Sequence, residues 1–427
     1  MTAQKAFDIL VCGATGFTGK LVLEYLHQQA PKQAFSYAVA GRNRQKLDQT
    51  VKELGIEPKE IVVVDAQDEE GLRQAVRRCK VVISLVGPYL RHGYPLAKVV
   101  AEEGVDYVDL TGESPFIVNS IKRNSSSALS TRSILIHSAG FDSVPSDLCA
   151  FLAVQQLKKQ LGPGNEDQVG QVTTMVSCAG GMSGGTFASL MAILEAGGED
   201  RSVAADPYAT SPIKGLDRPS LPLAQSLTYR GRKQYGFFWV MGPGNSQLVR
   251  RTWGLLQTAD DPEAKKLAYG RNFRYQETVK RIGGMRVRGP VGAVLVNVCF
   301  YTMFALLYLP PIRYLAKRFG LQSGDGPSKE EREAGWFKLE TVARSVDGKE
   351  EARAVMKGKG DPGYLGTSLM ISECALSLLQ DRPAGRLPPL AQQGGHLTPV
   401  TALGETLKER LERTGAFEFE VEGGKSE

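Results

Sequence analysis

The sequence predicts an α/β protein with a doubly wound parallel sheet at its N-terminal end, a second α+β domain, and C-terminal helices that return to the first domain. Over residues 7–137, short β-rich segments alternate with amphipathic ones, which is the pattern of a parallel sheet covered by helices. After Pro145 this rhythm stops, and the chain becomes richer in Gly, Pro and Arg. These two observations predict two different architectures in one chain.

The first domain is expected to contain six strands separated by helices, which is the usual number in a doubly wound sheet. The expected strands are Phe7–Cys12, Ser36–Ala40, Ile61–Asp65, Val81–Val86, Tyr107–Leu110 and Ile134–His137. The helices between them are Gly19–Gln29, Arg44–Glu53, Asp68–Cys79, Leu96–Glu103 and Ser114–Ser126.

Beyond Pro145 the expected elements are more scattered. They are helices Ser146–Leu161, Thr186–Ala196, Gly366–Leu379 and Pro399–Thr414, and strands Val169–Cys178, Tyr235–Met241, Phe337–Ser345 and Ala352–Lys357. The tail, Gly423–Glu427, is expected to fray. We therefore divide the chain into residues 1–148 (cofactor domain), 149–357 (substrate and dimerisation domain) and 358–420 (C-terminal helices packing on the first domain).

Composition excludes several classes of protein. The 427 residues are 42% hydrophobic and 23% charged, which is typical of a globular protein and excludes wholesale disorder and a multi-pass membrane protein. Six scattered cysteines, with no Cys-x-x-Cys pair, favour a reducing compartment and no metal site. The chain reaches a strand pattern by Phe7, with no room for a secretion signal, so we expect a cytoplasmic location.

A glycine-rich turn follows the first expected strand. It reads Gly13, Ala14, Thr15, Gly16, Phe17, Thr18, Gly19. Glycines at this spacing permit a tight turn, close approach of main-chain N–H groups to a pyrophosphate, and close packing of helix on sheet. The turn predicts a dinucleotide site, and the alternative is an ordinary turn between strand and helix.

The end of the second strand discriminates between nicotinamide cofactors. It carries Arg42 and Arg44 and no acidic residue. A guanidinium group would pair with the 2′-phosphate of NADP(H), whereas an NAD site usually has an acid there. The prediction is therefore NADP(H), and the alternative is that both arginines are solvated at the start of a helix.

Other candidates follow later strands. Asp65 and Ala66 would contact the adenine side, and Gly87 and Pro88 would lie near the nicotinamide, although the latter pair also suits a turn without a ligand. Tyr89 and His92 are nearby titratable groups and candidates for proton transfer. A single histidine in a loop can equally be polar surface.

The run Phe141, Asp142, Ser143 follows the sixth strand, at the sheet edge where such folds bind ligands. We expect Phe141 to contact the cofactor and Asp142 to orient substrate or transfer a proton. The run could instead be a capping loop that joins two domains. A glycine cluster at 180–185 could likewise bind a substrate anion or form a tight turn.

The charge is uneven along the chain. The net charge is +6, but residues 214–290 hold 15 basic and 5 acidic side chains. This region leads into Val291–Leu309, which is uncharged and is followed by Arg313, Lys317 and Arg318. The apolar run could be a buried helix or dimer contact, the wall of a lipophilic tunnel, or an anchor lying in one leaflet. Because it adjoins an uncharged run, the basic region does not indicate nucleic-acid binding.

Several motifs together resemble the saccharopine dehydrogenase-like oxidoreductases, including the trans-acting enoyl reductases. The resemblance extends over nearly the whole chain through residues 13–19, 41–42, 86–89, 109–113, 140–147, 183–186, 326–328, 360–364 and 394–399. It implies a Rossmann domain, a second α+β domain, and NAD(P)-linked chemistry on an acyl or amino-acid-derived substrate.

These observations predict an NADPH-dependent oxidoreductase that reduces an enoyl or carbonyl group of a hydrophobic, free or carrier-bound acyl substrate. Saccharopine itself is disfavoured because a zwitterionic substrate gives no reason for the apolar run. The alternative function is a non-catalytic NADP-binding protein at a membrane or lipid surface. Peripheral association with a membrane or lipid droplet, and a homodimer, are both compatible with the sequence.

Overall fold

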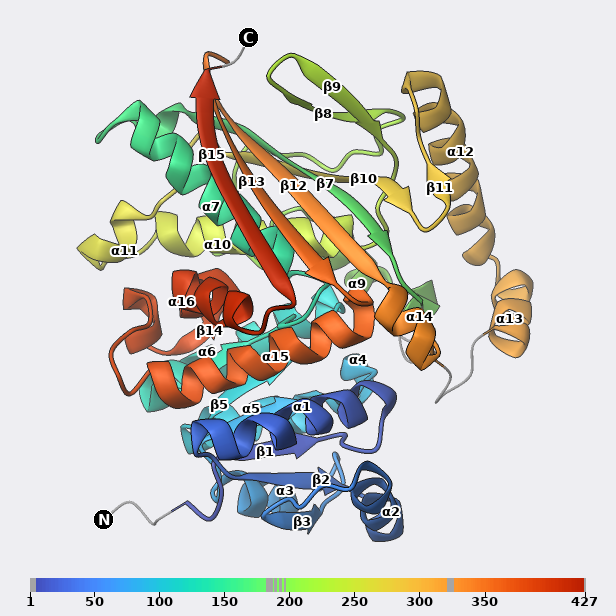
Figure 1. Cartoon of the computed structure of the whole chain (residues 1–427), viewed down its shortest axis with the longest axis vertical. Coiled ribbons are helices and arrows are strands. Elements are labelled where there is room, and N and C mark those ends of the chain that lie inside the picture. Colours follow the sequence, from blue (N-terminus) through green and yellow to red (C-terminus); the bar gives the residue numbers. More distant parts are fainter. Residues whose placement is uncertain are drawn as a thin grey trace.

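The computed structural model describes residues 5–181, 187, 190–191, 194–195, 197–320 and 326–425. Two sheets stand one above the other with helices between and around them (Figure 1). The glycine cluster at 180–185 and the helix expected at 186–196 lie largely outside the described residues, as does the motif at 183–186.

The first sheet has seven parallel strands in the order β14-β6-β5-β4-β1-β2-β3. Strand order reverses at β1 and β4, as in a doubly wound Rossmann fold, so the predicted fold class is confirmed. The elements are β1 Ile9–Cys12, α1 Phe17–Gln33, β2 Tyr37–Gly41, α2 Arg44–Leu54, β3 Glu60–Val63, α3 Glu69–Val76, β4 Val81–Ser84, α4 Tyr89–His92, α5 Tyr94–Glu103, β5 Asp106–Asp109, α6 Ser114–Thr131 and β6 Ile134–Ile136.

The second sheet is mixed and has six strands in the order β11-β10-β7-β12-β13-β15. Its strands are β7 Val169–Ala179, β10 Arg274–Ile282, β11 Met285–Arg286, β12 Trp336–Ser345, β13 Glu350–Lys359 and β15 Phe417–Lys425. A separate hairpin is formed by β8 Gln225–Tyr229 and β9 Arg232–Gly236. Thus only the first two residues of the strand predicted at Tyr235–Met241 are in a strand.

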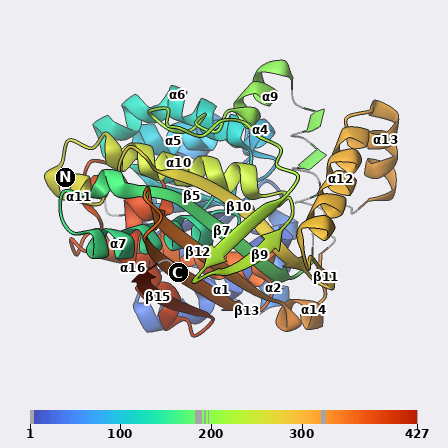
Figure 2. The same cartoon turned by 90° about the horizontal axis from the view of Figure 1, so that it is seen from above.

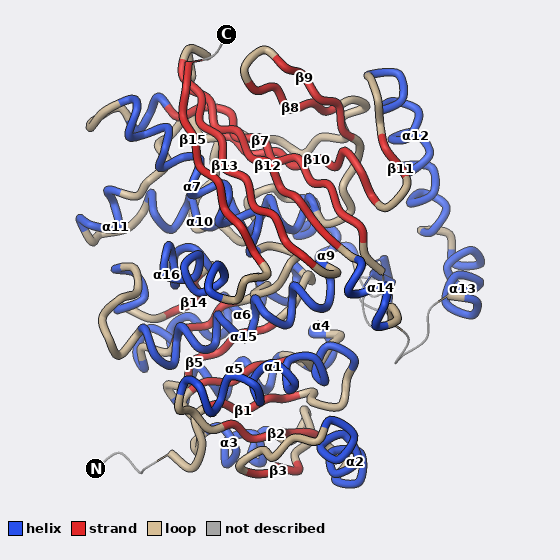
Figure 3. Tube along the Cα trace, in the orientation of Figure 1, coloured by secondary structure: helices blue, strands red, loops and turns tan. Residues whose placement is uncertain are grey.

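The remaining helices cover or connect the two sheets. They are α7 Val144–Leu161, η1 Glu166–Gln168, α9 Gly198–Ala205, α10 Gly242–Gln257, α11 Pro262–Lys266, α12 Pro290–Leu307, α13 Pro310–Phe319, α14 Lys329–Ala334, η2 Pro362–Gly366, α15 Thr367–Leu376, η3 Ser377–Asp381, η4 Pro389–Gln392 and α16 Pro399–Arg413. Helix α7 packs on the second sheet, while α15 packs on α1, β4 and β5. The trace in Figure 3 shows α15 and α16 between the two sheets.

The last part of the chain contributes a strand to each sheet. Strand β14, Gly395–Leu397, pairs in parallel with β6, and β15 pairs antiparallel with β13. The sequence did not predict β14, because three residues after two glycines give no readable alternation. The expectation of a frayed tail was wrong for residues 423–425, since Gly423 pairs with Ala352 and Lys425 with Glu350.

Candidate active site at the carboxyl edge of the first sheet

The glycine-rich turn adopts the close packing that its sequence predicts. Gly13 has φ +83°, and a Cβ atom on Gly19 would lie 2.4 Å from the carbonyl oxygen of Gly13. Ala14 is buried, whereas Thr15 and Gly16 are exposed. Gly16 is the N-cap of α1, with no side-chain cap and no acid in the first turn. Main-chain N–H groups at this helix end are therefore available to an anion such as a pyrophosphate.

Phe17 and Thr18 open α1 and are partly exposed. The ring of Phe17 meets that of Tyr364 edge-on at 5.1 Å, and the Arg332 guanidinium lies 5.2 Å from the Phe17 ring centroid. Since Arg332 and Tyr364 belong to α14 and η2, the later part of the chain closes over the glycine-rich turn.

The two predicted arginines lie in different settings. Arg42 is exposed, and its side chain makes no hydrogen bond or ion pair with any described residue. The Nε atom of Arg44 lies 2.9 Å from Asp48 Oδ1 on the surface of α2. The side chain of Asn43 caps this helix by accepting from the N–H of Lys46. Arg42 is thus the arginine whose guanidinium is uncommitted at the end of β2.

Asp65 and Ala66 follow β3, where Asp65 is exposed and accepts a hydrogen bond from the N–H of Gln67. Gly87 and Pro88 follow β4 and are joined by a cis peptide bond. The structure therefore brings the predicted cofactor residues to the same edge of the sheet, in the loops after β1, β2, β3, β4 and β6.

Tyr89 has a structural role in the loop after β4. Its hydroxyl donates to the carbonyl of Ser84 at 2.9 Å and accepts from the N–H of Leu110 at 3.2 Å. Burial, with the charge of Asp109 next, raises the pKa of Tyr89 well above its usual value. This geometry argues against the predicted proton-transfer role, because the only O–H proton is held by the main chain. His92, at the end of α4, is partly exposed.

Asp142 lies at the sheet edge after β6 and is a partly exposed residue, and its carboxylate receives no hydrogen bond from the described residues. A Cβ atom on Gly112 would lie 3.5 Å from Asp142 Oδ2, which places the carboxylate beside the loop after β5. Desolvation raises the pKa of Asp142 to about 7. A carboxyl group in this state can hold a proton near neutral pH and release it to a bound molecule.

Phe141 and Ser143 fix the loop on either side of Asp142. The N–H of Phe141 donates to Thr367 Oγ1 at 3.0 Å, and its buried ring packs on Phe337 with centroids 4.9 Å apart. Ser143 occupies the N-cap of α7, but its hydroxyl donates to Asn245 rather than capping the helix. The loop is therefore a rigid connection between the two domains, and Phe141 is turned into that junction.

Sequence reasoning missed the acids that hold these loops. Glu113 is fully buried and accepts from the N–H groups of Tyr89 at 3.0 Å and Leu90 at 2.8 Å. Asp361 similarly accepts from the N–H groups of Gly181 and Tyr364, both at 2.8 Å. The available signals were an acid directly before Ser-Pro at a helix start, for Glu113, and directly before Pro-Gly, for Asp361.

A second buried polar cluster lies on the α6 side of the same edge. Asp109 Oδ2 is 2.6 Å from His137 Nδ1, and His137 Nε2 is 3.1 Å from Ser120 Oγ. Ser120 Oγ is also 3.1 Å from His396 Nε2. Desolvation, with the charges of His137 and Arg251 adding to it, lowers the pKa of His396 well below its usual value. Ser120 is fully buried inside α6, so this cluster orders the sheet edge and exposes no nucleophile.

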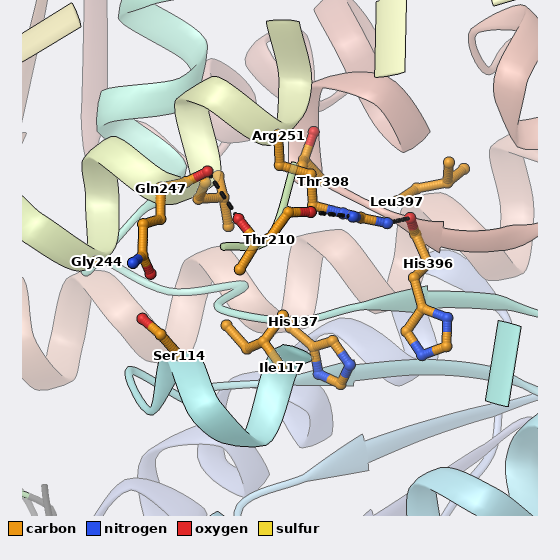
Figure 4. A pocket seen from close by; sticks show the side chains of 11 residues that line it. Ser114, Ile117, His137, Thr210, Gly244, Gln247, Arg251, His396, Leu397 and Thr398 are labelled. Carbon is orange, nitrogen blue, oxygen red and sulfur yellow. Dashed lines mark hydrogen bonds between the residues drawn. The ribbon is translucent and has the colours of Figure 1, made fainter. Parts of the chain in front are cut away.

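The cavity beside this cluster is small (Figure 4). It has a volume of about 20 Å³, which is enough for about one water molecule. Arg251 crosses its wall and donates to the carbonyls of Thr210 and His396. The cavity cannot hold an acyl chain, so it is not the substrate site.

The fold, the glycine-rich turn and the free Arg42 fit a bound NADP(H). The family profile described as the saccharopine dehydrogenase NADP binding domain matches residues 9–133. The chain is an NADP-dependent oxidoreductase.

Comparison of the whole chain with known proteins identifies the family of this oxidoreductase. A Mycobacterium tuberculosis protein described as a trans-acting enoyl reductase is 36% identical, over 97% of this chain and 98% of its own length. A trans-acting enoyl reductase of Mycobacterium ulcerans is 30% identical, over 97% of each chain. The chain belongs to the saccharopine dehydrogenase-like oxidoreductase family, which includes these enoyl reductases. The solved apo saccharopine dehydrogenase (L-Glu forming) of Saccharomyces cerevisiae aligns with 97% of this chain and 100% of its own, at 12% identity and a TM-score of 0.49.

Proposed function

We propose that this enzyme uses NADPH to reduce a carbon–carbon double bond conjugated to a carbonyl, in a hydrophobic acyl substrate. The observation that carries the proposal is the full-length similarity to proteins described as enoyl reductases. Reduction of a ketone on the same kind of chain needs the same hydride and one proton, and is the second reaction to test.

The chain's own residues supply binding and one proton. Main-chain N–H groups in the first turn of α1, after Gly16, would hold the pyrophosphate, and Arg42 the 2′-phosphate. NADPH supplies the hydride. We assign Asp142 as the proton donor, because it is a partly exposed residue at the ligand-binding edge, and its carboxyl lacks a hydrogen-bond partner among the described residues and has a pKa raised to about 7.

Substrate class is tested by following NADPH oxidation with 2-enoyl thioesters of increasing chain length and with matched long-chain ketones. Saccharopine is tested in the opposite direction, by following NADP⁺ reduction. We expect turnover of the enoyl thioesters, with kcat/KM rising with chain length. Turnover of saccharopine alone, or NADPH binding without oxidation by any of these acceptors, would overturn the proposed substrate.

The proton donor is tested by pH profiles of kcat. The wild-type rate should fall as pH rises through the region of pH 7, because the protonated acid is required. Asp142→Asn should lower kcat by about 10²- to 10⁴-fold and remove the fall of kcat, the alkaline limb of the profile, near pH 7. His92→Gln is the matched control and should retain this alkaline limb. An unchanged limb in Asp142→Asn would exclude Asp142 as the donor.

A further inference from the structure

Helices α12 and α13 form a hairpin with an exposed apolar surface. Helix α12 is long and apolar enough to cross a membrane, yet only 11% of its 18-residue window is buried. Val291, Leu295 and Phe319 are 71%, 63% and 79% exposed. The hairpin stands at the side of the molecule in both views (Figures 1 and 2). The interpretation of residues 291–309 as a buried core helix is therefore wrong.

Helix α12 is fixed to the body by one stripe of its surface. The buried Asn297 side chain accepts from the N–H of Phe238 at 2.5 Å and donates to the carbonyl of Leu223 at 2.8 Å. The hydroxyl of Tyr301 donates to the carbonyl of Pro222 at 2.9 Å. The Phe238 ring lies 5.7 Å from that of Phe304. These contacts hold the helix in place and leave its other faces open.

The second sheet prevents α12 from crossing a bilayer. Strand β7 precedes α12 in the chain and β12 follows it, and the two are paired along most of their length. A spanning α12 would put these two strands on opposite sides of the membrane. If the hairpin enters a membrane, it can therefore only lie in the plane of one leaflet, as a monotopic element does.

Exposed cations lie next to the apolar surface. Arg286 and Arg288 precede α12, and Arg318 is in the last turn of α13, and all three are exposed. Arg313 and Lys317 instead lie 3.5 Å and 2.5 Å from Glu195 Oε1. An apolar groove of about 430 Å³ is formed along the two helices, with Met303, Leu306 and Ile312 among its lining residues. Cations at both ends and an apolar groove between them match anionic headgroups above acyl tails.

We propose that the α12–α13 hairpin docks this enzyme onto an anionic phospholipid leaflet, with α12 parallel to the membrane plane. The proposal does not depend on the reaction that the enzyme catalyses. It would make the enzyme a peripheral membrane protein on the cytoplasmic side.

Flotation of the whole protein with vesicles tests the docking. We expect flotation with phosphatidylcholine–phosphatidylserine vesicles, and less with phosphatidylcholine alone or at high salt. The double variant Leu295→Asp/Phe319→Asp should lower the partition coefficient by about tenfold or more, and Arg286→Glu/Arg288→Glu should abolish the preference for phosphatidylserine. Val346→Asp, at a 54% exposed apolar residue in the turn between β12 and β13, is the matched control. Unchanged flotation of the double variant would overturn the proposal.

Cys299 offers a direct reading of depth, because it is the exposed one of the six cysteines and lies on α12. A polarity-sensitive fluorophore on Cys299 should shift to the blue on vesicle addition and be quenched by a nitroxide on the acyl chains. Quenching by dissolved iodide only would contradict insertion.

A concentration-dependent dimer that Leu295→Asp/Phe319→Asp dissolves, without flotation of the wild type, would instead assign the surface to a second copy. All variants should keep NADPH affinity and turnover of a soluble short-chain acceptor, so loss of docking is separable from loss of function.

Discussion

Gly13 lies directly against the main chain of Leu85: a Cβ atom on Gly13 would be 2.8 Å from both the carbonyl carbon and the carbonyl oxygen of Leu85. The two residues follow β1 and β4, between which strand order reverses in the sheet. The glycine-rich turn therefore packs directly against the main chain that follows the neighbouring strand β4.

Gly13→Ala should lower the free energy of unfolding by about 2 kcal/mol or more, from a strained positive φ together with the contact to Leu85. Gly55→Ala is the matched control, because Gly55 has φ +60° and ψ 34°, in the left-handed helical region, and no atom within 4 Å of its Cβ position. It should cost about 1 kcal/mol. Urea unfolding of both variants measures the difference, and equal losses would contradict the close contact.

Arg42→Asp should weaken NADPH binding by about 10- to 100-fold and leave NADH binding unchanged or improved, because the carboxylate repels a 2′-phosphate. Titration calorimetry with both cofactors measures this change. Arg44→Asp should have a smaller effect, since Arg44 is already paired with Asp48. Equal effects would show that both arginines contact the phosphate.

Stability should respond to pH through Asp142. The pKa of Asp142 is raised from 3.8 to about 7 in the folded protein, so the carboxyl ionises at lower pH in the unfolded chain than in the folded one. The wild type should therefore lose stability as pH rises from about 4 to about 7, and Asp142→Asn should become progressively more stable relative to it over this range, with no further change above it. Urea unfolding at several pH values tests this, with Asp65→Asn as the exposed control. A pH-independent difference would contradict the desolvated setting of the carboxyl.

A buried ion cluster joins the C-terminal helices to the first domain. Arg410 lies 2.7 Å from Glu373 and 3.1 Å from Asp381, and its Nη2 atom donates to Gln33 in α1 at 2.9 Å. Arg410→Ala should cost about 3 kcal/mol, because buried Glu373 loses its cation and keeps only the Tyr25 hydroxyl, while Asp381 keeps its ion pair with Arg386. Arg413→Ala, at an exposed pair with Glu409, should cost less than about 1 kcal/mol. Thermal unfolding distinguishes the two variants.

Local patterns were enough to predict six of the seven strands of the first sheet, because alternation, apolar runs and glycines mark each of these strands and the helices between them. The uncommitted state of Arg42 and the desolvation of Asp142 could not be read in the same way. Both depend on what lies nearby in space, and Asp142 owes its setting to neighbours such as Gly112 and Tyr89 on other loops. Strand β10 was not predicted, because its sequence contains polar residues such as Glu277 and Thr278. Both are buried, and their side chains form hydrogen bonds with residues distant in the sequence.

The pairing of β14 with β6 and of β15 with β13 has a consequence for synthesis of the chain. Neither sheet has all of its strands until residues 395–425 have been synthesised, because each sheet receives one strand from them. Unpaired strand edges readily join other chains. A chain truncated before residue 395 would therefore expose β6 and β13 as new edge strands, one in each sheet.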